Sequence, residues 1–74
     1  MKVFVAKILV EDIDFNSCSV HLFKTLEEAQ RFADGEIDDC ALGYDGCVTE
    51  RASRKYSMAA GDIYVTIDIE EHEL

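Results

Sequence analysis

The sequence predicts a small α+β domain: an antiparallel sheet of about three strands with one or two helices packed on one face, in the order β-β-α-(α)-β. Three observations lead to this prediction. Apolar residues alternate with a period of two near both ends of the chain, a helix-capping signal lies between those segments, and 49% of the residues are hydrophobic. Its 74 residues are enough for one domain only, which we expect to span 1–74.

The first strand is predicted over 2–10. Its even positions after Lys2 are apolar, and its odd positions are mostly apolar too. Such a strand lies in the centre of a sheet or turns its second face to a partner. A second alternating segment, Cys18–Phe23, follows after a short polar stretch, so an antiparallel hairpin is the simplest connection. We expect Cys18 on the core face of this strand.

A helix is predicted to begin at Thr25. Thr25 and Glu28 have the spacing of a capping box, in which the two residues satisfy free amides of the first turn. Gly35 is placed to end the helix. The expected buried stripe consists of Leu26, Ala29, Phe32 and Ala33.

Two interpretations are open for the next segment. Asp45-Gly46 can turn a hairpin between strands at Cys40–Tyr44 and Cys47–Arg51. Alternatively, Asp45 caps a second helix that ends at Gly61, with Val48, Ala52, Tyr56 and Ala59 on one face. We favour the helix, because Ala, Arg, Lys and Met are good helix formers.

The last strand is predicted over 62–70. Ile63, Val65, Ile67 and Ile69 alternate there with more polar residues, as in a strand that is buried on one face.

Charge narrows the range of partners. Sixteen acidic against seven basic residues give a net charge of −9, which repels phosphate backbones and anionic lipids. Direct binding to nucleic acid or membrane is therefore disfavoured, and a basic protein would be attracted. The N-terminal residues lack a signal-peptide pattern, and no stretch approaches the length of a membrane span, so we expect a cytoplasmic protein.

The three cysteines do not form a convincing chemical site. An odd number excludes a complete disulfide framework, and we expect free thiols. Cys18, His21, Cys40 and Cys47 could supply zinc ligands, but Cys18 and His21 should point to opposite faces of their strand. No nucleophile elbow or phosphate-binding loop is present. We therefore expect neither metal, nor cofactor, nor enzymatic activity.

Two groups of residues are candidates for binding. One is an acidic run that could match a basic surface on a partner or simply be solvated. It consists of Asp34, Glu36, Asp38 and Asp39. The other is an apolar patch that could mediate homodimer contacts, unless the second helix covers it. It consists of Val3, Val5 and Leu9, with Phe23 beside them on the next strand.

Three segments resemble small acidic proteins of phages and mobile elements: Met-Lys-Val-Phe-Val at 1–5, Leu-Phe-Lys-Thr-Leu-Glu-Glu-Ala-Gln-Arg-Phe-Ala at 22–33, and Ile-Tyr-Val-Thr-Ile-Asp-Ile-Glu-Glu at 63–71. The resemblance implies the anti-defence or host-takeover type, which includes anti-CRISPR proteins and DNA mimics. The expected function is thus inhibition or modulation of a basic, nucleic-acid-handling host protein in the host cytoplasm. The alternative is a small homo-oligomeric structural or interaction protein that uses the apolar face of the first strand.

Overall fold

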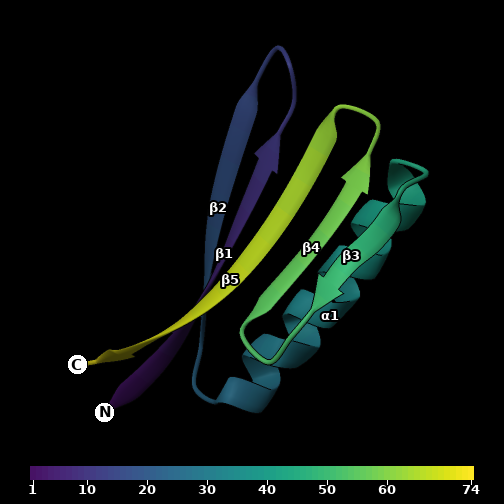
Figure 1. Cartoon of the computed structure of the whole chain (residues 1–74). Coiled ribbons are helices and arrows are strands. Elements are labelled where there is room, and N and C mark those ends of the chain that lie inside the picture. Colours follow the sequence, from purple (N-terminus) through teal and green to yellow (C-terminus); the bar gives the residue numbers. More distant parts are fainter.

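The computed structural model describes all 74 residues as one five-stranded antiparallel sheet and one helix (Figure 1). The elements are β1 (Lys2–Glu11), β2 (Asn16–Phe23), α1 (Leu26–Gly43), β3 (Cys47–Arg51), β4 (Lys55–Ala60) and β5 (Ile63–Glu73). The predicted α+β class is confirmed, but the sheet has five strands instead of about three.

The strands lie in the order β2-β1-β5-β4-β3. The first and last strands of the chain, β1 and β5, pair along their length, from Lys2 opposite Glu73 to Glu11 opposite Tyr64. β1 also pairs with β2, as the predicted hairpin requires. The strands expected over 2–10, 18–23 and 62–70 are therefore confirmed, and β1 has a neighbour on each side.

The start of α1 agrees with the capping signal. Thr25 is the N-cap residue, and its Oγ1 accepts a hydrogen bond from the Glu28 amide at 3.2 Å. The Glu28 carboxylate accepts from the Thr25 hydroxyl at 3.3 Å, in place of the backbone amide expected in a complete capping box. Ala29 and Ala33 are buried, and Leu26 and Phe32 pack against the core, so the predicted stripe is confirmed.

The predicted end of the helix is wrong. α1 continues through Gly35 to Gly43, because the apolar stripe continues at Ile37, one turn after Ala33. A glycine inside a helix costs about 1 kcal/mol, and burying a whole isoleucine side chain gains about 1.5–3 kcal/mol. The Gly46 amide donates to the Ala41 carbonyl at 2.8 Å and helps to close the helix end.

Of the expectations for 40–61, only the strand Cys47–Arg51 of the hairpin interpretation is confirmed, as β3. The strand at Cys40–Tyr44 and the favoured second helix are wrong. Residues 40–43 belong to α1, and the segment expected as a second helix forms the β3–β4 hairpin. Tyr56 and Met58 are buried at alternate positions of β4, so burial with a period of two overrides the helix propensity of this segment. Gly61, expected as a helix terminator, instead has a φ of +61° in the β4–β5 turn.

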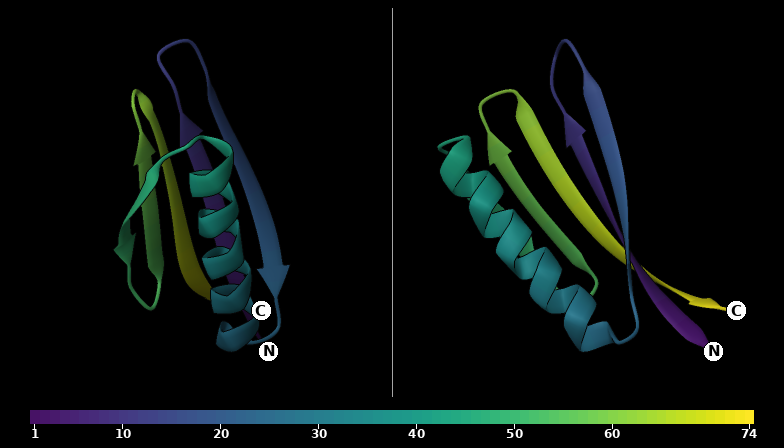
Figure 2. Two further views of the ribbon diagram at one scale, coloured as in Figure 1. Left: turned by 90° about the vertical axis from the view of Figure 1, so that its right-hand side faces the viewer. Right: turned by 180° about the vertical axis from the view of Figure 1, so that it is seen from behind.

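The molecule has two layers, with α1 on one face of the sheet and nothing on the other (Figure 2). α1 contacts all five strands, and β4 most extensively. Only 11 residues are buried. Ten of them form the core between helix and sheet: Ala6, Ile8, Ala29, Ala33, Ile37, Tyr56, Met58, Val65, Ile67 and Ile69. We call the uncovered side of the sheet the open face.

Two glycine substitutions should have opposite effects on stability. A Cβ at Gly35 meets nothing within 4 Å, so Gly35→Ala should stabilise the protein by about 0.5–1 kcal/mol. A Cβ at Gly46 would lie 2.6 Å from the Ala59 carbonyl oxygen and from Met58 Cε. Overpacking of this kind costs about 1–3 kcal/mol. Urea unfolding of both variants measures the difference, and equal effects would contradict the packing at Gly46.

Candidate functional site

The acidic run lies on α1, and two of its members face β3. Asp34 and Asp38 are four residues apart, so they lie on one side of the helix. Arg51 of β3 contacts both carboxylates: its Nη1 binds Asp34 Oδ1, and its Nη2 lies 2.5 Å from Asp38 Oδ1. About half of each carboxylate side chain remains exposed. Both ion pairs of the helix therefore connect it to the edge of the sheet.

The other two members of the run lie elsewhere on the helix. Glu36 is half-buried and Asp39 is exposed, and neither forms an ion pair within the chain. Burial raises the pKa of the nearby Cys40 thiol, and the charges of Glu36 and Asp39 raise it further. The four predicted residues thus form two separate surfaces instead of one patch.

Arg51 is the residue that sequence reasoning missed. Hydrogen bonds to Asp38 and Asp34 raise the pKa of its guanidinium, so it is cationic at any physiological pH. The favoured prediction placed Arg51 in a second helix that begins at Asp45, and that helix gave no reason to expect Arg51 close to Asp34. As part of β3 it pairs with Tyr56, and both side chains turn towards α1.

A hollow of about 420 Å³ lies between α1 and the β3–β4 turn. Gln30 spans its edge, and its Nε2 donates to the Ser53 carbonyl at 2.8 Å. Tyr56 lines it, and burial, together with the Asp34 charge, raises the pKa of its phenol. Because Arg51 already binds two carboxylates, Arg31 is the one cation of the hollow without an ion-pair partner.

Only some members of the predicted apolar patch lie on the same face of the sheet. Val3, Val5 and Leu9 do lie on the open face, where no second helix covers them, but neighbouring side chains bury Val5. Phe23 lies on the opposite face, because it pairs with Phe4 and stacks on Phe32 with ring centroids 5.1 Å apart. Leu22 is the residue beside Val5. Alternation within each strand could be predicted, but the register between the strands could not.

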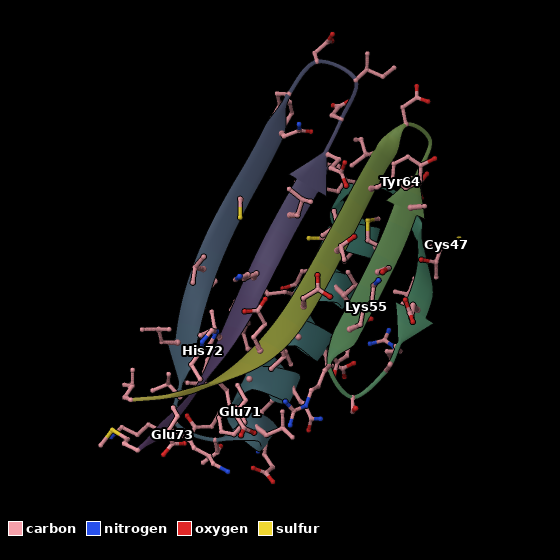
Figure 3. All side chains as sticks on the ribbon, turned by 60° about the vertical axis from the view of Figure 1, so that its left-hand side comes forward. Cys47, Lys55, Tyr64, Glu71, His72 and Glu73 are labelled. Atoms are coloured by element: carbon pink, nitrogen blue, oxygen red, sulfur yellow. The ribbon has the colours of Figure 1, made fainter.

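Charged groups cross the middle of the open face. Lys7 Nζ lies 3.1 Å from Glu70 Oε1, and His72 Nε2 lies 3.0 Å from Glu70 Oε2. The hydrogen bond from Lys7, followed by that with His72, lowers the pKa of Glu70. Figure 3 views this face with α1 behind the sheet, and Lys55 and Tyr64 lie on it.

The candidate zinc ligands are dispersed. Cys18 pairs with Leu9 on the open face and is exposed, so its predicted core position is wrong. His21 lies on the opposite face, as predicted, with its ring 4.6 Å from that of Phe32. Cys47 is exposed on β3, and no group of three or more side chains in the structure could hold a metal ion.

Comparison of the chain with protein-family models, curated proteins and solved structures finds no match. The structure contains no helix that combines the length and apolar character needed to cross a membrane.

Removing the cation that joins α1 to β3 should weaken the fold. We expect Arg51→Gln to lower Tm by a few degrees at low salt and by less at high salt, because exposed ion pairs are screened. Arg31→Gln removes the same charge from a residue without an ion pair and is the matched control. Equal Tm changes in the two variants would contradict a specific role of Arg51.

The thiols should differ in reactivity. Cys18 and Cys47 are exposed, whereas Cys40 is half-buried and has a raised pKa, so iodoacetamide should modify Cys40 severalfold more slowly. Peptide mass spectrometry gives the three rates. Neutralising Glu36 and Asp39 as Glu36→Gln/Asp39→Asn should speed modification at Cys40, because the thiolate is then less disfavoured. An unchanged rate would show that these charges do not act on Cys40.

Proposed function

We propose that this protein binds a basic, nucleic-acid-handling host protein and modulates it by occupying its nucleic-acid surface. The proposal is one of binding without catalysis, and it follows the resemblance to phage anti-defence proteins. The observation that carries it is the acidic surface of α1. Six of the 18 residues of this helix are carboxylates and only one, Arg31, is basic.

The density of charge along the helix supports mimicry of nucleic acid. Eighteen residues of helix extend about 27 Å, so the carboxylates occur about once every 4.5 Å. One strand of duplex DNA carries a charge about every 3.4 Å. The linear density of negative charge along α1 is therefore comparable with that of one DNA strand, with the carboxylates distributed over two surfaces of the helix.

The contacts within the chain divide the acidic surface into two parts. Asp34 and Asp38 are partly neutralised and held in place by Arg51. Glu36 and Asp39 are uncompensated and free to meet a cation of the partner. We propose that all four contact the partner, the first two through their exposed oxygens and the last two as its main charges.

Capture from host lysate tests the proposal when salt and nucleic acid are varied. We expect one basic protein that is retained at low salt, lost at high salt and released by added duplex DNA. Asp38→Lys/Asp39→Lys should slow its association about tenfold or more, because long-range attraction is reversed at the contact surface. Surface plasmon resonance with the purified partner measures the association rate.

A matched variant separates local from total charge. Asp62→Lys/Asp68→Lys makes the same charge change in the β4–β5 turn and on the open face, away from α1. Association of this control should slow much less. Equal slowing in both variants would disprove the assignment to α1, and a captured protein that DNA does not displace would disprove mimicry.

A further inference from the structure

β2 is an edge strand without the features that usually prevent edge-to-edge association. It pairs with β1 on one side, and no strand lies along its outer edge (Figure 1). It has eight residues, none of them proline and none charged, and its register with β1 is unbroken. Native edges are usually short, bulged or charged, because an open edge can pair with another chain.

The other edge of the sheet has all of these features. β3 has five residues, its register shifts between Val48 and Glu50, and it carries Glu50 and Arg51. β2 is moreover the one strand in the sheet with no charged residue. In a protein with a net charge of −9, self-association is least opposed by repulsion along such a strand.

The side chains of β2 also lie opposite to the usual pattern. Two of its large apolar residues face solvent on the open face, where Val20 is 56% exposed and Leu22 is 67% exposed, whereas Phe23 faces α1. Ser17, Ser19 and His21 occupy the face that carries α1. Val20 and Leu22 therefore form an exposed apolar strip along the open edge of the sheet, next to the buried side chain of Val5 on β1.

We infer that a second copy of this chain pairs with the β2 edge, with the two β2 strands antiparallel about a two-fold axis, to form a continuous ten-stranded sheet. Charge complementarity favours this occupant and this direction. Asp12 and Asp14 precede β2, and Lys24 follows it. Antiparallel pairing places the acidic end of each β2 beside Lys24 of the other copy, so the dimer has two such contacts. Parallel pairing would place the two acidic ends together and the two lysines together. Neither Asp14 nor Lys24 has an ion pair within its own chain.

The alternation of side chains restricts the register. Residues directly opposite each other must point to the same face, so even positions of one β2 meet even positions of the other. With the axis at Val20, this residue meets its counterpart, and Leu22 meets Cys18 of the second copy. Lys24 then lies opposite Asn16, next to the loop that contains Asp14. The exposed apolar side chains bury one another, and Lys7 at the middle of the open face stays in water.

Sedimentation equilibrium of the full chain at about 5–500 μM tests the inference. We expect a monomer–dimer equilibrium in the unmodified protein, and a single monomeric species over this range would overturn the inference. Leu22→Lys should weaken association about tenfold or more, because it places charges beside the two-fold axis. Leu42→Lys is the matched control: Leu42 is 85% exposed at the end of α1, so this variant should dimerise normally. Circular dichroism of each variant verifies its fold.

A charge swap tests the antiparallel geometry. Lys24→Glu should weaken the dimer about tenfold at low salt, since two attractive contacts become repulsive. Adding Asp14→Lys to this variant should restore association. A dimer that is insensitive to Lys24→Glu but weakened by Tyr64→Lys would overturn edge pairing in favour of packing between open faces. This inference does not depend on the basic partner.

Discussion

One helix must cover a sheet of five strands, and most features of this protein follow from that constraint. A helix with its side chains is about 10–12 Å wide. Five strands at about 4.8 Å spacing make a sheet roughly twice as wide. Ala29 and Ala33 let α1 approach the sheet closely, and its contacts are most extensive on β4. The open face has no covering element and the outer edge of β2 has no neighbouring strand, so both are exposed to partners.

The predictions that the structure confirms came from local sequence patterns. Alternation over 2–10, 18–23 and 62–70, and the cap at Thr25, depend on neighbouring residues. The errors concern competition between local and distant effects. Gly35 is a typical helix end, but burial of Ile37 carries the helix past it. The 45–60 segment has helix formers, but Tyr56 and Met58 become buried only because α1 lies across β4.

In the candidate site, too, local features could be predicted and long-range contacts could not. The sequence shows the acidic run from Asp34 to Asp39, but the predicted helix end at Gly35 left most of this run outside the helix. It could not show that Asp34 and Asp38 contact Arg51, because that pairing depends on β3, which was expected to be a helix. The β2 edge was missed for a related reason. Which face of β2 meets the core depends on its register with β1, and no residue within β2 determines that register.

The pairing of β1 with β5 has a consequence for how the chain folds. Lys7 and Glu70, which meet across this pair, are 63 residues apart in the sequence. Contacts of such long range are slow to form, because most of the chain must first be confined. Neither the β1–β2 hairpin nor the β3–β4 hairpin has a complete core before this pairing, and isolated hairpins are marginal in water. Folding should therefore be a single cooperative event whose rate is set by the meeting of the two ends of the chain.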